Sequence, residues 1–449
     1  MGLATLVLLI SVLSASPGVV RAETDSIRRI EELEKRIILL EQKIRQLESV
    51  GQPEEVLAKT DEPTTEEPSP AFPSENLPAT AVSHATRQVH VNEASTQDDL
   101  ETSEVRLPIS GYMDFHFNKI QNQDSKLDFH RFVLLFGHSF TDRIQFWSEL
   151  EIEHAFVSGE GEFGEIELEQ AYLDFLFKPW MNFRGGMLLA PVGILNERHE
   201  PPSFQGVERT FVDTMIVPST WFDSGAGVFG DLGKGFVYRA YVMSPLDATG
   251  FDAEEGLRGG RQKGFQSVTK NVAYTGRLEY HGFPGLSLGS SYWIGNTGFN
   301  LADINPRVRL VEFDGRYSVR RFDFRGQFAD VSISHTSELN SMLQRGMGVS
   351  PNIARQLRGF YGEVGYHLLP ESTPHDIVAF FRYENFDTQR RMAPGFLPLK
   401  QFDREAYVIG ATYYPEPDVA IKFDYSILSN KSSIIKANNS FNLGLGWWF

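Results

Sequence analysis

The chain of 449 residues contains no cysteine. This absence removes both a disulfide framework and a thiolate metal site, so the chain is not a small secreted domain held together by disulfides. Long apolar runs are also scarce, and the longest, Leu3 to Leu13, is too short to cross a membrane as a helix. Basic residues are in the minority, and the net charge of −17 disfavours nucleic-acid binding. No dinucleotide fingerprint or P-loop appears where a strand leads into a helix.

The first 22 residues predict a secretory signal peptide. The apolar run Leu3 to Leu13 precedes a stretch of small residues that ends at Val20-Arg-Ala22, which fits a cleavage site. The segment before the apolar run has no lysine or arginine, which suggests that the true start codon lies upstream. We therefore expect the chain from residue 23 onward to be exported.

Residues 23–50 predict an α-helical coiled coil of about three heptads. The apolar a and d positions are Ile30, Leu33, Ile37, Leu40, Ile44 and Leu47. Ile at a with Leu at d favours two strands by the general rule. The segment Arg36 to Glu41 instead resembles a short trimerisation motif, in which Arg36 covers the apolar Ile37 and Leu40 and pairs with Glu41 of a neighbouring chain. We favour a trimer, with a dimer and a lone helix as alternatives, and three heptads need an oligomer formed elsewhere.

Residues 51–105 are rich in Pro, Glu, Thr and Ser, as in Glu62 to Pro70, and have few large apolar residues. Such a segment cannot bury enough surface to fold, so it predicts a flexible, disordered linker. Much of the negative charge of the chain lies in this linker and in the coiled coil.

Residues 106–449 predict an all-β transmembrane barrel of about sixteen antiparallel strands. Short connections alternate with longer polar ones, a pattern typical of outer-membrane barrels. The short connections are expected near residues 141–142, 178–180, 231–235, 282–285, 319–320, 369–374 and 415–417. The long ones are expected near residues 119–126, 155–164, 190–222, 245–270, 295–306, 332–354, 387–402 and 429–438. Sixteen strands leave an aqueous channel, and a soluble β-sandwich is the alternative.

Alternation within strands assigns the two faces. In Val419 to Ile427, the apolar Ile421 and Phe423 oppose Lys422 and Asp424. A charge that faces hydrocarbon costs about 2 to 4 kcal/mol near the bilayer midplane, so the charged face is expected to line the lumen. The mean hydropathy of −0.26 agrees, because the two faces cancel. The segment Glu165 to Phe177 breaks the alternation near Gln170, which predicts a β-bulge.

The chain ends at Phe449 on an aromatic strand in which every second residue from Phe441 is apolar. An open edge of this kind pairs with other chains, whereas closure into a barrel in lipid removes the edge. A terminal Phe on such a strand resembles the signature by which outer-membrane β-barrels are recognised for assembly.

The third long connection contains Asn196 to Pro202, then Val207 to Asp213, then Val217 to Trp221. With Glu169 to Asp174 before it and Gly225 to Gly230 after it, this stretch resembles the phosphate-selective porin O and P family, firmly over residues 165–232 and more loosely over the rest of the barrel. The resemblance implies a homotrimer of sixteen-stranded barrels whose third loop folds inward to narrow each channel. It implies five constriction residues: Arg198, His199, Glu200, Glu208 and Arg209. The alternative is that these residues anchor the loop to the barrel wall.

Strand alternation predicts the pore lining. The predicted basic residues are Arg239, Arg277, Arg321, Arg325, Arg382 and Lys422, and the acidic ones are Glu149, Glu151, Asp323, Glu363, Glu384 and Asp424. Anion selectivity needs a ring or ladder of basic side chains. No continuous ladder is visible, which departs from the pattern of the family and favours a general or modestly selective channel over a phosphate channel.

We expect no enzyme activity, no cofactor and no metal. Ser, His and Asp residues are scattered, and barrels with hydrolase activity tend to be smaller. His116, His130, His138 and His154 fall on different predicted strands, so ordinary lumen or interface histidines are expected. The sequence thus predicts a trimeric outer-membrane porin with a periplasmic coiled coil, which passes small hydrophilic solutes. The family resemblance alone suggests phosphate or other small anions. A structural anchor, joined to the cell wall by the coiled coil, is the second reading.

Overall fold

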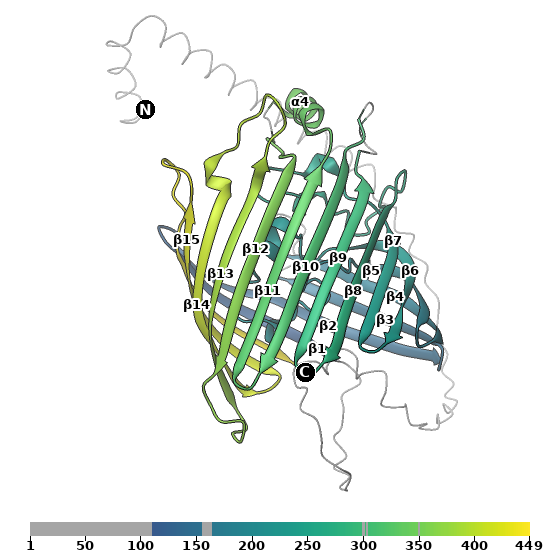
Figure 1. Cartoon of the computed structure of the whole chain (residues 1–449), viewed down its shortest axis with the longest axis vertical. Coiled ribbons are helices and arrows are strands. Elements are labelled where there is room, and N and C mark those ends of the chain that lie inside the picture. The colour runs from purple at the N-terminus through teal and green to yellow at the C-terminus, as the bar shows by residue number, and fades with distance from the viewer. Residues whose placement is uncertain (1–109, 155–163, 299–300, 302–303, 349–350) are drawn as a thin grey trace, which may run out of the picture. The chain divides into compact units, whose positions relative to one another are not determined.

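The computed structural model describes residues 110–154, 164–298, 301, 304–348 and 351–449. The predicted signal peptide, coiled coil and linker lie outside these residues. The described chain forms one closed barrel of sixteen antiparallel strands in sequence order, with β1 paired to β16 (Figure 1). The predicted strand number and closure are therefore confirmed. No helix among the described residues is long and apolar enough to cross a membrane.

The strands are β1 (Ser110–Ile120), β2 (Ser125–Thr141), β3 (Ile144–Glu153), β4 (Glu165–Lys178), β5 (Met181–Leu189), β6 (Phe222–Gly233), β7 (Phe236–Met243), β8 (Ala273–Phe283), β9 (Leu286–Asn296), β10 (Arg307–Val319), β11 (Phe322–Ile333), β12 (Gln356–His367), β13 (Asp376–Arg391), β14 (Asp403–Glu416), β15 (Val419–Asn430) and β16 (Ser440–Trp448). The helices are the 3-10 turns η1 (Pro201–Ser203), η3 (Ala248–Gly250), η4 (Arg258–Gly260) and η5 (Lys400–Phe402), the π-helix η2 (Val212–Ile216) and α4 (Thr336–Met347).

The first and last strands close the barrel. The Gly111 amide donates to the carbonyl of Phe449 at 3.0 Å, and the Phe449 amide donates back at 2.9 Å. The Phe449 ring stacks on Phe132 of β2, with ring centroids 5.9 Å apart. The terminal aromatic residue thus satisfies the edge of β16 instead of leaving it open.

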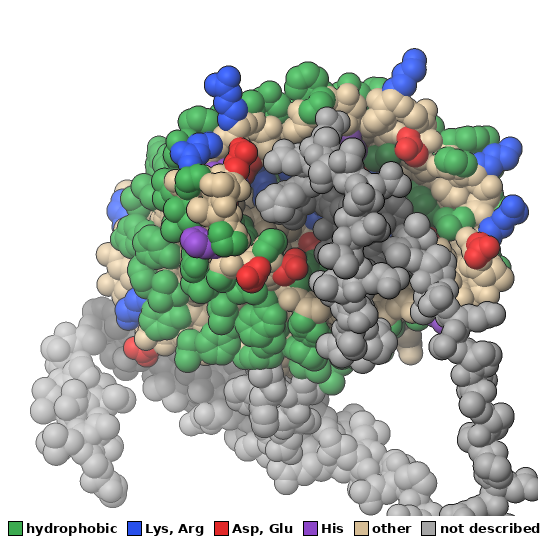
Figure 2. Space-filling model, turned by 90° about the horizontal axis from the view of Figure 1, so that it is seen from below, with side chains coloured by type: hydrophobic (Ala, Val, Ile, Leu, Met, Phe, Trp, Pro, Cys, Tyr) green, Lys and Arg blue, Asp and Glu red, His purple; other side chains and the backbone are tan. Residues whose placement is uncertain are grey.

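The predicted alternation of faces holds. On β15, Ile421 and Phe423 are exposed on the outer face, whereas Lys422 and Asp424 are buried on the inner face. Viewed from the end of the barrel, hydrophobic side chains gather around its outer surface (Figure 2). The outer face is therefore suited to an apolar surrounding.

The connections alternate in length as predicted, with one exception. Turns join the strands at the end of the barrel where the C-terminus lies, and longer loops lie at the opposite end with α4 (Figure 1). We call these the turn end and the loop end. The first connection at the loop end, predicted to be long over residues 119–126, is only residues 121–124, because β1 and β2 stay paired up to Lys119 and Ser125.

Two β-bulges add residues to the inner face of β2 and β4. Asp114 pairs with Arg131 and Phe115 with Phe129, so His130 is the extra residue of β2. Glu149 pairs with Gln170 and Leu150 with Leu168, so Glu169 is the extra residue of β4. The second bulge confirms the break in alternation predicted near Gln170. Bulges often re-aim side chains at functional sites, and here both extra residues are ionisable.

The inner face is not polar throughout. Near the loop end, inward residues of β9 to β11 such as Trp293, Leu310 and Val331 are buried in an apolar core. Loop residues Ile216 and Leu339 belong to the same core. Part of the lumen is therefore filled by packed loops, because these inward positions are apolar and bury against one another.

Candidate pore constriction

Residues 190–221, between β5 and β6, form the third loop at the loop end, which we call loop 3. Its two ends are tied together by Asn196, the first residue of the stretch Asn196 to Pro202. The Asn196 side-chain amide donates to the carbonyls of Ala190 (2.7 Å) and Trp221 (2.9 Å), and its oxygen accepts from the Trp221 amide at 2.8 Å. One buried side chain thus fixes the neck from which the loop enters the barrel.

Loop 3 crosses the lumen and binds the wall opposite its own strands. Arg325 Nη2 on β11 donates to the Ser203 carbonyl at 2.9 Å. Arg382 Nη1 on β13 donates to the Gln205 carbonyl at 3.1 Å. The wall therefore holds the middle of the loop through its backbone carbonyls.

Lys422 on β15 makes the same kind of contact twice. Its ammonium donates to the carbonyls of Phe204 and Gly206, both at 2.8 Å, and lies 3.9 Å from the centre of the Phe204 ring. The neighbouring Asp424 accepts from the Val207 amide at 2.7 Å. Backbone groups that would be orphaned inside the lumen are thus satisfied by charged wall residues.

The basic residues of this wall also have acidic partners. Arg277 lies 2.6 Å from Asp314, and Arg382 lies 3.0 Å from Glu363 and 2.8 Å from Glu384. A buried charge is tolerated only when it is paired and hydrogen-bonded. We call β8 to β15 the paired wall, because its buried cations have carboxylate or carbonyl partners.

The wall formed by β1 to β4 differs. Glu149, Glu151 and Glu169 face inward and are buried, with Arg131 as the strand cation beside them, 3.0 Å from Glu151. Neither carboxylate oxygen of Glu151 or Glu169 has a hydrogen bond among the described residues. We call β1 to β4 the acidic wall, because carboxylates exceed the cations that face them.

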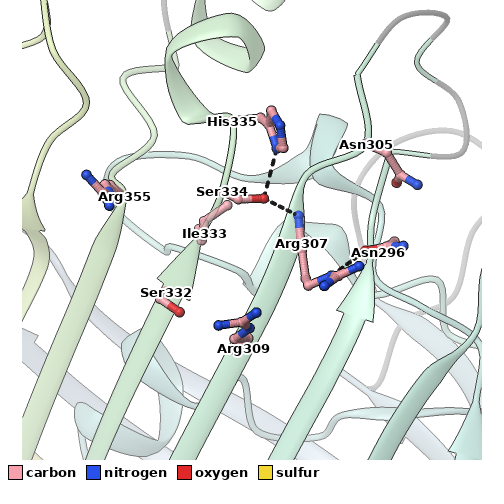
Figure 3. Close-up of a pocket in the computed structure, with 9 residues that line it drawn as sticks. All are labelled: Asn296, Asn305, Arg307, Arg309, Ser332, Ile333, Ser334, His335 and Arg355. Atoms are coloured by element: carbon pink, nitrogen blue, oxygen red, sulfur yellow. Dashed lines mark hydrogen bonds between the residues drawn. The ribbon is translucent and has the colours of Figure 1, made fainter.

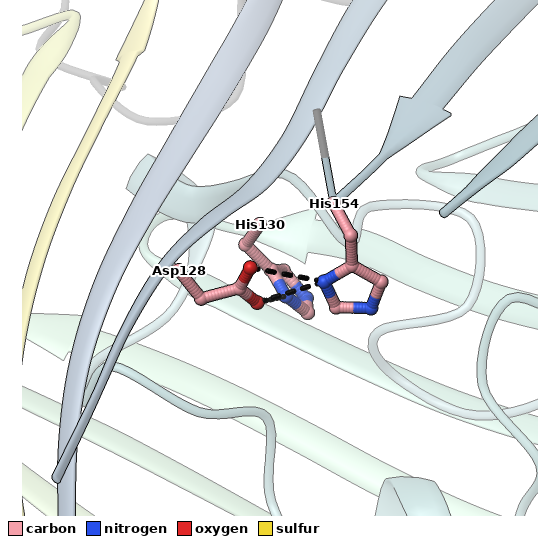
Figure 4. Close-up of side chains that lie close together, drawn as sticks. All are labelled: Asp128, His130 and His154. Carbon is pink, nitrogen blue, oxygen red and sulfur yellow. Dashed lines mark hydrogen bonds and ion pairs between the residues drawn. The ribbon is translucent and has the colours of Figure 1, made fainter. Parts of the chain in front are cut away.

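Three histidines lie together on this wall, which the sequence did not indicate. The rings of His116 and His130 stack at 4.6 Å, and those of His130 and His154 meet edge to face at 5.6 Å. Asp128 lies 2.9 Å from His154 Nδ1 and 3.4 Å from His130 Nδ1 (Figure 4). The prediction that the four histidines lie on different strands is wrong, since His130 and His138 both lie on β2. Strand pairing and the bulge at His130 bring His116, His130 and His154 together. His138 lies elsewhere on β2, against Phe140.

Asp128, His130 and His154 offer donor atoms within 4.8 Å of one another, a spacing that could hold a metal ion. These atoms also have hydrogen-bond partners within the protein. Arg131 Nη2 donates to His130 Nε2 at 2.6 Å, so His130 carries its proton on Nδ1, facing Asp128. Metal binding at Nδ1 would release that proton, so the same side chains can form a hydrogen-bonded network or act as metal ligands.

Loop 4, residues 244–272, reaches the acidic wall as well. Its Lys263 lies 3.0 Å from Glu165 and also pairs with Glu167. Burial lowers the pKa of Lys263, but the hydrogen bonds to Glu167 and Glu165 outweigh it and raise the pKa above its usual value. Lys263 is therefore a cation that partly neutralises the negative charge of this wall.

Three of the five predicted constriction residues are held by the walls. Arg198 lies 3.3 Å from Glu279 on β8, and His199 is buried 3.2 Å from Glu169 and 3.0 Å from the Tyr112 hydroxyl. Glu208 is half exposed, 3.1 Å from His116. Their contacts match the alternative reading, in which loop 3 is anchored by ion pairs. Glu200 and Arg209 are partly buried, and Arg209 Nη2 has no hydrogen bond among the described residues.

The predicted lining residues face inward with unequal exposure, except Arg321, which lies in the turn before β11 and contacts Tyr366 beside the outward-facing Phe322. Those buried against loop 3 or their strand neighbours are Arg277, Arg382, Lys422, Glu149, Glu151, Glu363, Glu384 and Asp424. Those partly exposed are Arg239, Arg321, Arg325 and Asp323. Most of the cations that could have formed an anion ladder instead hold loop 3 or a carboxylate.

The prediction of no enzyme activity took no serine to lie in a nucleophile motif, which is wrong as a statement about the sequence, since Gly285 to Gly289 has the Gly-x-Ser-x-Gly spacing. Its serine, Ser287, lies within strand β9 directly after a turn. Hydrolases with this motif place the serine on a sharp turn from a strand into a helix. The spacing therefore does not mark a nucleophile here.

Comparison with known proteins places the chain beside one relative of similar sequence. An uncharacterized protein of Aquifex aeolicus (strain VF5) is 36% identical over 357 residues, which cover 76% of this chain and 79% of that protein. The chain belongs to the family of this Aquifex protein. No protein-family model matches the chain, so membership in the phosphate-selective porin O and P family is not confirmed.

Solved structures resemble the barrel at low sequence identity. OmpF of Salmonella typhi, solved with daunomycin, has a TM-score of 0.51 at 12% identity and covers 76% of this chain and 97% of its own. An anion-selective porin from Comamonas acidovorans has a TM-score of 0.49 at 11% identity, with coverage of 76% and 98%. The likeness to OmpF supports a porin-like fold.

Proposed function

We propose that this protein is an outer-membrane porin that passes small hydrophilic solutes by passive diffusion. The observation that supports this most is loop 3, which enters a closed sixteen-strand barrel and is held across the lumen by the charged side chains of its walls. A rigid inward loop sets the width of a channel, and the surrounding barrel keeps its outer face apolar. The OmpF-like fold agrees with this function.

Weak ion selectivity is the expected behaviour. Arg382 and Lys422 have partners in carboxylates or in loop 3 carbonyls, so they present little free positive charge to a solute. The acidic wall opposes them across the lumen. Phosphate and other small anions, which the resemblance to the porin O and P family suggests, are accordingly candidate solutes among others.

The proposal extends to the parts of the chain before residue 106. Residues 1–22 would direct export, residues 23–50 would form a periplasmic coiled coil, and residues 51–105 would link it to the barrel at 106–449. A homotrimer in outer-membrane lipid fits the segment Arg36 to Glu41, which resembles a trimerisation motif. The cell wall is a candidate partner of the coiled coil.

Reversal potentials across a planar bilayer test this function. The purified full chain would be measured in a potassium chloride gradient and then with phosphate in place of chloride. We expect stable conductance with weak selectivity. A strongly anion-selective potential, with chloride current blocked by low phosphate, would instead support the narrower phosphate channel.

The same experiment addresses the alternative of a structural anchor. Absence of conductance from correctly folded protein would contradict the porin proposal and favour an anchor tied to the cell wall. Folding would be checked by circular dichroism and by heat-dependent mobility on gels, so that a misfolded sample is not read as a closed channel.

A further inference from the structure

A pocket of about 550 Å³ opens on the outer face of the barrel at the loop end of β9 to β12. Its polar lining includes Arg307, Arg309, Arg355 and His335 (Figure 3). It lies outside the lumen, because Arg307 and Arg309 are exposed and alternate along β10 with Val308 and Leu310, which are buried in the inner core. The pocket is therefore separate from the constriction.

The arginines of this pocket have no acidic partner. Among the described residues, no carboxylate lies within ion-pair distance of Arg307, Arg309 or Arg355; Arg307 Nε donates to the neutral Asn296 oxygen at 2.8 Å. The nearby Asp330 is already paired with Arg358 at 2.7 Å. Three like charges around one pocket repel one another, so an anion that bridges them would lower the free energy.

His335 adds a hydrogen-bond donor. The Ser334 hydroxyl oxygen accepts from the Arg307 amide at 2.9 Å and lies 3.0 Å from His335 Nδ1. With the Ser334 hydroxyl donating to Nδ1, His335 carries its proton on Nε2 and can donate to a ligand. Arginine forks match the geometry of phosphate oxygens, and together with this donor they favour a phosphate group.

The outer surface on the turn-end side of the pocket favours a lipid as the source of the phosphate group. Along the outer face of β10, Arg307 and Arg309 are followed toward the turn end by the exposed Val311 and Phe313. Tyr292 of β9, which pairs with Val311, is exposed as well. A charged pocket directly above an apolar strip matches a molecule with a phosphate head and acyl chains.

We propose that this pocket binds the phosphate of an outer-leaflet lipid headgroup, with the acyl chains along β9 and β10. The site rests on the proposed location in an outer membrane, since that places the loop end at the outer headgroups. A lone arginine costs little at this depth, but three without a counter-ion are expected to recruit one.

Native mass spectrometry of the detergent-solubilised full chain tests the site with three probes: bisphosphorylated lipid A, the same lipid dephosphorylated, and inorganic phosphate. The wild type should bind the phosphorylated lipid at least about tenfold more tightly than the dephosphorylated one. The double variant Arg309→Gln with Arg355→Gln should lose that difference. Arg390→Gln, an exposed arginine at the end of β13 outside the pocket, is the control and should keep it.

Three results would overturn the site: equal binding of both lipids, equal loss in Arg390→Gln, or displacement of the lipid by millimolar inorganic phosphate, which would indicate a soluble-anion site. Conductance of the double variant should match the wild type. If the wild type conducts but does not prefer the phosphorylated lipid, only the lipid-site proposal is contradicted. If the wild type does not conduct, the proposed porin function is contradicted.

Discussion

The paired wall of β8 to β15 and the acidic wall of β1 to β4 treat buried charge in opposite ways. On the paired wall, Arg382 has two carboxylates and a loop 3 carbonyl, and Lys422 has two carbonyls. On the acidic wall, the carboxylates of Glu151 and Glu169 have no hydrogen bond among the described residues, and their ion-pair partners are Arg131 and His199. One wall is built to hold the loop, whereas on the other the carboxylates outnumber the cations.

The difference predicts a division of roles. Charges on the paired wall should govern stability and the position of loop 3, because removing one leaves its buried partner alone. Charges on the acidic wall should govern which ions enter, because the carboxylates there outnumber their close cationic partners and leave a net negative field. Substitutions on the two walls should therefore differ in the sign of their effect on stability.

The largest effect is expected for Arg382→Ala. It leaves Glu363 and Glu384 without their cation and frees the Gln205 carbonyl of loop 3. The free energy of unfolding should fall by about 3 to 5 kcal/mol, and single-channel conductance should rise as loop 3 loosens. Denaturant unfolding in detergent and bilayer recordings would measure both.

Arg321→Ala is the control, since Arg321 lies in the turn before β11 and, among the described residues, has no carboxylate partner; it contacts the hydroxyl of Tyr366 at 3.4 Å and the face of its ring. It should cost less than about 1 kcal/mol. If the two variants lost equal stability, pairing would not distinguish the arginines of this wall.

An intermediate effect of opposite sign is expected for Glu169→Gln on the acidic wall. The substitution removes one of three crowded buried carboxylates, and its partner His199 keeps Tyr112 and Glu149 as neighbours, so the free energy of unfolding should stay the same or rise by about 1 kcal/mol. The reversal potential should move toward anions. Glu384→Gln, which weakens the ion pair with Arg382, should instead lower stability by about 1 to 3 kcal/mol. Equal losses in both variants would contradict the contrast between the walls.

The sequence predicted the barrel well because its signals are local. Two-residue alternation in Val419 to Ile427, polar turns and the break near Gln170 depend only on neighbouring residues, and all three appear in the structure. The constriction depends on residues far apart in sequence. Nothing in the alternation of β15 indicates that Lys422 would bind the carbonyls of Phe204 and Gly206.

The rule that charged residues face water also fails where it matters for the outer pocket. It would place Arg307 and Arg309 in the lumen, yet they lie outside, while Val308 and Leu310 point inward. The packed loops make the lumen apolar at this level, so lumen and lipid cannot be told apart by hydrophobicity there. The histidine cluster was missed for a related reason, since it depends on strand register and on the bulge at His130.

The smallest effect on stability is expected for Lys263→Ala, which removes a partly exposed cation from the acidic wall. Surface ion pairs contribute little, so the free energy of unfolding should change by less than about 1 kcal/mol. Selectivity should nevertheless move toward cations, because Glu165 and Glu167 lose their partner. The shift in reversal potential should shrink between roughly 0.1 M and 1 M salt, since the Debye length falls from about 10 to 3 Å.

Lys431→Ala removes a lysine that is paired with Asp403 at 2.8 Å, away from the acidic wall, and should leave the reversal potential unchanged. If Lys431→Ala shifted the reversal potential as much as Lys263→Ala, the net charge of the protein, and not the acidic wall, would determine the ion selectivity. If neither did, the field of β1 to β4 would not reach the permeating ions. A shift in Lys263→Ala but not in Lys431→Ala would indicate that the acidic wall determines the selectivity of the channel, since of these two lysines it is Lys263 that pairs with carboxylates of β4.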